Sequence, residues 1–325
     1  MISRISTLAL LLFAAFLCGS LAEEPMAKRT SMILCVGVGG TPDYAEAFSS
    51  WAVNWQRAAE AAGAGLVSIG LDADSDTDLD KLRAALKSEP KEGTEPLWLV
   101  MLGHGTFDGH EPKFNLRGTD LGVSELAGLL QPFNRPVVIV AAFSSSGAFL
   151  TPLSKRGRII VTATRSGAEN NFARLGKYLS EAIADPTADL DHDGQTSLLE
   201  AWLGAARKVA DFYKTEGRLA TEHSLLDDNG DKHGTPADWF SGLKVVKKTS
   251  DGSAPDGMRA HQIHLLPSEA ERELPPDLRA KRDGLELELA DLRAKKAAMK
   301  EDEYFTQLEA ILRRIAAIYH DPGKS

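Results

Sequence analysis

Cysteine and long basic runs are scarce in this 325-residue chain, and each scarcity excludes a class of protein. With only 2 cysteines, the fold cannot rest on a framework of several disulfides. The formal net charge is −9, and no block of Lys and Arg is long enough to follow a phosphate backbone, so we expect no nucleic-acid partner. The 43% of apolar and 26% of charged residues are typical of a globular protein and exclude a fibrous or fully disordered chain.

The N-terminal sequence predicts export. A basic residue precedes an apolar run from Leu8 to Cys18, and Ser20-Leu21-Ala22 places small residues where a signal peptidase reads them. We therefore expect residues 1–22 to be a signal peptide that is cleaved after Ala22, which makes the mature protein secreted or periplasmic. The apolar run is too short to span a bilayer comfortably, so no stable membrane anchor is expected after cleavage. Cys35 then remains as the single cysteine, and its apolar neighbours predict a buried structural thiol.

From Met32 onward, short apolar runs alternate with helical patterns. Runs rich in Val, Ile and Leu and bounded by Gly and Pro predict strands at 32–38, 66–71, 96–103, 136–142 and 158–163. Periodic stretches predict helices at 45–62, 78–87 and 124–130, and a further helical region spans 173–217 around an acidic loop. This alternation predicts an α/β domain over 31–266, in which helices cover both faces of a mostly parallel sheet.

The last segment, 269–325, is a charged helical extension whose boundary is marked by Pro275-Pro276. Two apolar stripes with heptad spacing are interrupted near Lys300–Glu303; they consist of Leu278, Leu285, Leu289, Leu292 and Met299, then Tyr304, Leu308, Ile311, Ile315 and Ile318. We expect two antiparallel helices that turn near Lys300–Glu303, with one kinked helix as the alternative. Isolated helices of this size are marginal in water, so each stripe must pack against the other stripe, the core domain or a second protomer. In the last case the extension is a coiled coil through which the protein self-associates.

Two of the predicted strands end in residues that suit covalent catalysis. The first leads into Gly103-His104-Gly105, and the second leads into Ser144-Ser145-Ser146-Gly147. Open parallel sheets place their sites at the carboxyl ends of strands. A serine hydroxyl beside His104 on the neighbouring strand would form a nucleophile and its base. Taken singly, each segment also fits a polar strand end or a serine-rich turn.

Together, the two segments resemble the catalytic layout of the caspase/legumain superfamily of cysteine peptidases. In that layout a strand ending in Gly-His-Gly is followed some forty residues later by a strand ending in Cys-x-Ser-Gly. The chain looks most like the bacterial, exported branch nearest legumain, over roughly 31–240. The resemblance implies a caspase-like three-layer α/β/α sandwich and a protein or peptide as substrate or ligand. It aligns His104 with the catalytic histidine and Ser144 with the catalytic cysteine.

Ser144 is a departure from that layout, and it leaves two hypotheses open. A serine hydroxyl needs a base in direct hydrogen-bond contact, usually oriented by an acidic group, and the family layout supplies no such acid. The first hypothesis is therefore a pseudoenzyme, a degenerate peptidase domain that acts as a scaffold or binding module. The second is an active hydrolase that uses Ser144 as nucleophile and His104 as general base, with the backbone N–H groups of Gly105 and Ser144 binding the oxyanion.

The segment 189–200 fits the twelve-residue EF-hand loop. Oxygen ligands fall at loop positions 1, 3, 5, 9 and 12, a backbone carbonyl at 7 and a glycine at 6; the ligands are Asp189, Asp191, Asp193, Gln195 (carbonyl), Ser197 and Glu200. We expect one structural Ca²⁺ ion that orders the flanking helical segments, with an affinity of about 10⁻⁴ M or weaker because the loop has no partner of equal quality. The alternative is an acidic helix–helix turn that binds nothing.

A second acidic segment repeats part of this spacing. Asp227, Asn229 and Asp231 follow the 1-3-5 pattern, but Lys232 stands where the loop needs glycine. For this reason the sequence predicts a turn without a ligand at this segment.

Overall fold

The computed structural model describes residues 29–72, 77–247, 249 and 254–319. The expected signal peptide and its cleavage site after Ala22 lie outside the described residues. In the described ranges, none of the helices combines the length and the apolar character needed to cross a membrane.

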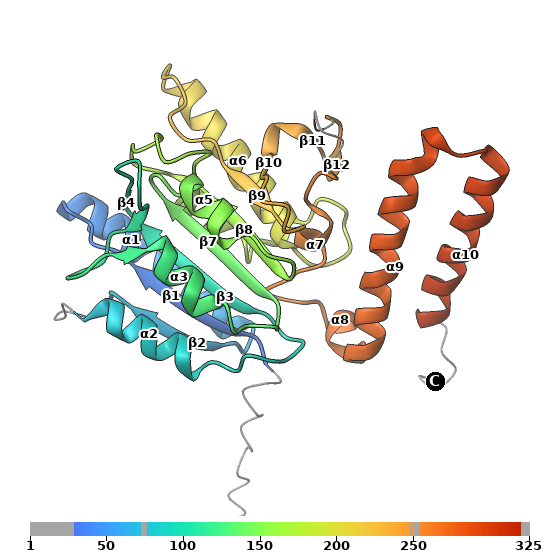
Figure 1. The fold of residues 1–325 in the computed structure, drawn as a ribbon, viewed down its shortest axis with the longest axis horizontal. Coiled ribbons are helices and arrows are strands. Elements are labelled where there is room, and N and C mark those ends of the chain that lie inside the picture. The colour runs from blue at the N-terminus through green and yellow to red at the C-terminus, as the bar shows by residue number, and fades with distance from the viewer. Residues whose placement is uncertain (1–28, 73–76, 248, 250–253, 320–325) are drawn as a thin grey trace, which may run out of the picture.

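A seven-stranded sheet with the order β10-β9-β8-β7-β3-β1-β2 forms the centre of the molecule (Figure 1). Neighbouring strands are parallel from β8 to β2, and β9 and β10 each pair antiparallel at the other edge. The strands are β1 (Ser31–Val36), β2 (Gly65–Ile69), β3 (Leu97–Gly103), β7 (Val137–Phe143), β8 (Arg158–Thr162), β9 (Leu225–Asp227) and β10 (Thr235–Pro236). The predicted α/β class with a mostly parallel sheet is confirmed.

Helices cover both faces of this sheet because side chains alternate along each buried strand. On β1, Met32 and Leu34 pack towards one face, whereas Ile33 and Cys35 pack towards the other. The first face is covered by α1 (Pro42–Ala61), α5 (Leu175–Ala182) and α6 (Leu198–Thr215). The second is covered by α2 (Asp78–Ser88), α3 (Val123–Leu130) and α4 (Gly147–Leu153). These three layers are compatible with the caspase-like sandwich that the resemblance implies.

Several short elements complete the domain, and the sequence pattern does not predict them individually. A small antiparallel sheet follows β3, and a two-stranded ribbon follows β10. The short elements are β4 (Gly105–Thr106), β5 (Lys113–Phe114), β6 (Leu121–Gly122), η2 (Pro186–Ala188), η3 (Ala237–Trp239), β11 (Phe240–Ser241), β12 (Lys244–Val245), α7 (Met258–His261) and α8 (Glu269–Glu273). Cys35 is fully buried, and this burial raises the pKa of its thiol.

The C-terminal segment is a pair of antiparallel helices, α9 (Pro276–Lys295) and α10 (Glu301–Tyr319), which lie side by side beyond the sheet (Figure 1). Their apolar stripes pack on each other in one cluster; its buried members are Leu274, Leu285, Leu289, Leu292, Tyr304, Ile311 and Ile318. The turn consists of η4 (Lys296–Ala298) and the two residues after it, so it begins slightly before the predicted position. An ion pair of 3.2 Å between Arg279 and Glu95 links α9 to the sandwich.

Candidate functional site

The Gly103-His104-Gly105 and Ser144–Gly147 segments lie at the carboxyl ends of two neighbouring strands in the middle of the sheet. β3 and β7 are adjacent parallel strands, and Gly103 is in register with Phe143. The residues that follow these positions, His104 and Ser144, are therefore brought to the same carboxyl edge, where open α/β sheets carry their sites. The structure places the two segments next to each other, as the sequence predicts.

Ser144 is engaged with the backbone of Gly105. Its side chain is buried, and its Oγ accepts a hydrogen bond of 3.0 Å from the amide of Gly105. The same hydroxyl donates a hydrogen bond of 3.1 Å to the carbonyl of Gly105. We call this two-way contact the Ser144–Gly105 clasp. It uses the serine proton, and it also occupies an amide that the sequence hypothesis assigns to the oxyanion.

His104 lies in an aromatic surrounding and bonds to backbone. Its Nε2 is 3.2 Å from the carbonyl oxygen of Gly39, so the ring donates through Nε2. The ring centroids of Tyr44 and Phe48 each lie 5.1 Å from that of His104, in edge-to-face contact, and Phe172 lies 6.1 Å away. Among the described residues no hydrogen bond joins His104 to Ser144.

Partial burial determines the charge state of His104. Desolvation lowers the pKa of His104 below its ordinary value of 6.5, and the hydrogen bond to Gly39 opposes this only in part. The ring is therefore neutral at pH 7. Because the unfolded chain binds this proton more readily than the folded one, His104 reduces stability as the pH falls below about 6.5 towards the lower folded-state pKa.

A titration of the His104 ring by NMR tests whether its pKa is lowered in the folded protein. We expect a midpoint below 6.5, and in His104→Phe we expect a smaller loss of unfolding free energy between neutral pH and pH 5 than in the wild type. A midpoint at or above 6.5 contradicts the assignment.

The carboxylate–histidine pair of this region involves a different histidine. Nδ1 of His223 lies 2.5 Å from Oε1 of Glu169, and the other oxygen of Glu169 accepts the amides of Arg165 and His223. The main-chain carbonyl of Glu169 accepts the amide of Ser145. This contact places the pair beside the turn at residues 144–146, which we call the serine turn. Sequence reasoning does not find this pair, because 54 positions separate the partners and neither lies in a motif.

The acids that follow His104 in the chain are used locally. Asp108 accepts the amides of His110 and Glu111, and Asp120 accepts the amide of Leu116. Among the described residues, no carboxylate therefore orients His104.

The glycines and the third serine of the two segments are required by packing. A Cβ on Gly105 would lie 2.4 Å from the carbonyl oxygen of Ser144, and a Cβ on Gly147 would lie 2.2 Å from the amide nitrogen of Ser166. Oγ of Ser146 accepts the amides of Ala163 and Thr164, which ties the turn after β7 to the end of β8. Gly105, Ser146 and Gly147 therefore hold the backbone at the site in place.

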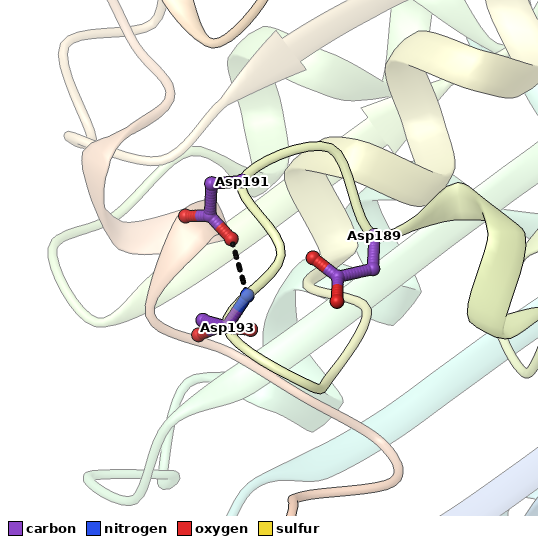
Figure 2. Close-up of side chains that lie close together, drawn as sticks. All are labelled: Asp189, Asp191 and Asp193. Atoms are coloured by element: carbon purple, nitrogen blue, oxygen red, sulfur yellow. Dashed lines mark hydrogen bonds between the residues drawn. The ribbon is translucent and has the colours of Figure 1, made fainter.

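The acidic loop 189–200 brings three carboxylates together (Figure 2). Oxygens of Asp189, Asp191 and Asp193 all lie within 4.8 Å of one another. Oδ1 and Oδ2 of Asp189 accept the amides of His192 and Gly194, and the backbone is left-handed at both of these residues. Oδ2 of Asp191 also lies 3.0 Å from Nε2 of His261. Three clustered carboxylates are a donor set that fits a hard ion such as Ca²⁺.

The other predicted ligands of this loop hold the start of α6. Ser197 and Glu200 form a capping box, in which Oγ of Ser197 accepts the amide of Glu200 and Oε2 of Glu200 accepts the amide of Ser197. Oε1 of Glu200 accepts the amides of Leu190 and Asp191. The side chain of Gln195 accepts the amide of Ser268, which leaves its carbonyl as the expected ligand group. Among the acids of the predicted ligand set, Asp189, Asp191 and Asp193 thus bring their carboxylates together, whereas the carboxylate of Glu200 bonds to backbone amides.

No protein-family model and no curated protein matches the chain. Among solved structures, the chain is similar to the Drosophila initiator caspase Dronc, with 12% identity and a TM-score of 0.42, over 72% of this chain and 95% of that one. It is also similar to Chaetomium thermophilum Raptor, with 16% identity and a TM-score of 0.31, over 42% of this chain and 15% of that one. With TM-scores below 0.5, these likenesses add no argument about function to the geometry above.

Proposed function

We propose that this chain is an exported, catalytically degenerate caspase/legumain-like domain that serves as a calcium-binding scaffold or binding module for a protein or peptide. The observation that carries the proposal is the Ser144–Gly105 clasp. It is supported by the position of the Gly-His-Gly and Ser-Gly segments, which lie side by side at the carboxyl ends of β3 and β7.

The chemistry of serine nucleophiles explains why the clasp matters. An active serine hydrolase needs a hydroxyl bonded to its base, a base oriented by an acid, and free N–H groups for the oxyanion. Here the hydroxyl of Ser144 bonds to Gly105, His104 bonds to the carbonyl of Gly39, and the amide of Gly105 is already taken. The first two requirements are thus unmet in this arrangement, and one of the two hypothesised oxyanion donors is already engaged.

An active hydrolase that uses Ser144 with His104 as base is the second candidate. The observation that favours it is the lowered pKa of His104, because a general base must be neutral at working pH. For this activity the side chain of Ser144 must turn away from Gly105 and reach the imidazole. That rotation would break both hydrogen bonds of the clasp.

Labelling with a serine-directed fluorophosphonate separates the two candidates. We expect the wild type to show no label above the background of Ser144→Ala. A label that Ser144→Ala abolishes would establish the active hydrolase and overturn the degenerate assignment.

Ser144→Cys adds a second readout. Cleavage of peptides by this variant would show that His104 and the surrounding surface remain competent and that only the nucleophile is lost.

The calcium part of the proposal rests on the convergence of Asp189, Asp191 and Asp193. A single loop of this kind binds at about 10⁻⁴ M or weaker, which suits an extracellular compartment rich in calcium. The ion would neutralise the three carboxylates and stabilise the junction before α6. Calorimetry and melting curves at millimolar calcium test it: we expect heat of binding and a higher Tm in the wild type, and a loss of both effects at this loop in Asp193→Asn.

A further inference from the structure

The loop between β9 and β10 repeats the hydrogen-bond arrangement of the first acidic loop. Oδ1 of Asp227 accepts the amide three residues ahead, at 2.9 Å, and the side-chain oxygens of Asn229 and Asp231 accept the amides two residues ahead, each at 2.8 Å. In the first loop, Asp189, Asp191 and Asp193 accept amides at the same offsets. The two loops therefore fold their backbones in the same way.

Lys232 does not prevent this fold, although its side chain is the reason the sequence predicts an empty turn. Its φ is +72°, in the left-handed region that Gly194 adopts at the matching position of the first loop, where φ is +91°. The amide of Lys232 donates to Oγ of Ser154 at 3.0 Å, which anchors the strained residue to the end of α4. The side chain is exposed to solvent and leaves the inside of the loop open.

An unpartnered buried oxygen gives independent support for a ligand here. Asp227 is 1% exposed, and among the described residues its Oδ2 has no hydrogen-bond partner. The other oxygen accepts the amide of Gly230, so the carboxylate lies over the turn of its own loop. A buried carboxylate oxygen without a donor is costly, so a cation beside Oδ2 would be stabilising.

The surrounding charge points the same way. Asp228 and Asp256 are also buried, and their oxygens accept backbone amides from the loop and from α7. In the part of the chain that the structure describes, no Lys or Arg forms an ion pair with Asp227, Asp228 or Asp256. Three neighbouring buried acids thus lack a fixed positive charge. Amides and the Thr235 hydroxyl bond to Asp228 and Asp256, and a nearby cation would relieve the repulsion among the three acids.

We propose that residues 227–233 form a second divalent-cation site of the Ca²⁺ type. Its side-chain ligands are Asp227, Asn229 and Asp231, its main-chain ligand is the carbonyl of His233, and water completes the coordination. The position that closes an EF-hand loop is occupied by Asp238, which pairs with Lys247 at 2.5 Å and does not take part. The ion would stabilise the loop between the edge strands β9 and β10, which the Lys232 amide already ties to Ser154 at the end of α4.

Counting bound ions on the full-length protein tests the proposal, with Ca²⁺ alone as the probe. After treatment with a chelator, titration calorimetry and native mass spectrometry should both give two ions per chain for the wild type. Asp227→Asn, which keeps the shape of the side chain, should bind one ion, and so should Asp193→Asn. Asp238→Asn is the matched control and should still bind two. If Asp227→Asn binds as many ions as the wild type, the second site does not exist.

Two further results keep this test independent of the first loop. A wild type that binds one ion, which Asp227→Asn removes and Asp193→Asn retains, supports the second site while it overturns the first. Lys232→Gly relieves the left-handed backbone and removes a positive charge beside the loop, so it should bind the second ion several-fold more tightly without a risk to folding. Unchanged affinity in Lys232→Gly, together with an Asp227→Asn variant that does not fold, contradicts the proposal.

Discussion

Gly147→Ala is expected to destabilise the protein by about 3 kcal/mol and to disorganise the serine turn. A Cβ at this position would lie 2.2 Å from the amide nitrogen of Ser166, 2.3 Å from the carbonyl carbon of Arg165 and 2.6 Å from the carbonyl oxygen of Thr164. All three atoms belong to backbone, so no side chain can rotate to make room. The turn after β7 must therefore move away from the loop after β8.

Gly128→Ala is the matched control for this substitution. Gly128 lies within α3, and a Cβ there would meet nothing within 4 Å. The same chemical change should stabilise the protein by roughly 0.5–1 kcal/mol, because alanine favours the helix over glycine. Urea denaturation of both variants measures the difference. A Gly147→Ala variant as stable as the wild type would show that the two loops are not packed as described.

Glu200→Ala is expected to cost about 2–3 kcal/mol of unfolding free energy in the absence of calcium. Glu200 is 1% exposed, and its two oxygens accept the amides of Leu190, Asp191 and Ser197 as well as the Ser197 hydroxyl. Removal of the carboxylate leaves these donors without a partner, and those of Ser197 lie in the buried part of the junction. The acidic loop and the first turn of α6 should loosen together.

Two control variants separate this effect from ordinary capping and from charge. Ser268→Ala removes the cap of the short, more exposed helix α8, and it should cost at most about 1 kcal/mol. Glu200→Gln keeps the length of the side chain but turns an NH₂ group towards amide donors, so its cost should be intermediate. Thermal unfolding in a chelator ranks the three variants. If Glu200→Ala is no less stable than Ser268→Ala, the carboxylate is not the anchor of this junction.

The sequence predicts the parts of the fold that long apolar runs encode. Strands such as β3 and β7 are buried on both faces, so nearly every residue along them is apolar and the pattern is unambiguous. Two-residue strands such as β4 have no periodicity to detect. The turn between α9 and α10 has no Gly or Pro to mark it, which explains why its predicted position near Lys300–Glu303 differs slightly from the observed one.

The candidate site could be predicted only as far as neighbouring strands determine it. Adjacent parallel strands bring His104 and Ser144 to one edge, and the sequence is sufficient for this step. The Ser144–Gly105 clasp depends on the rotamer of a single hydroxyl, and the Glu169–His223 contact depends on tertiary packing. Lys232 shows a third limit. Left-handed backbone is uncommon at residues other than glycine, so the sequence pattern argues against the conformation that Lys232 adopts.

The strand order gives the two parts of the molecule very different folding speeds. In the sheet, Ser31 pairs with Leu97 and Leu97 pairs with Val137, so each closure must bring together distant chain segments before its contacts form. α9 and α10 are joined by a short turn, and a hairpin of this kind can close within about microseconds, whereas non-local sheets take milliseconds to seconds. A refolding chain should therefore carry a formed helical hairpin while its sheet is still assembling, and the Arg279–Glu95 ion pair should be among its last contacts to form.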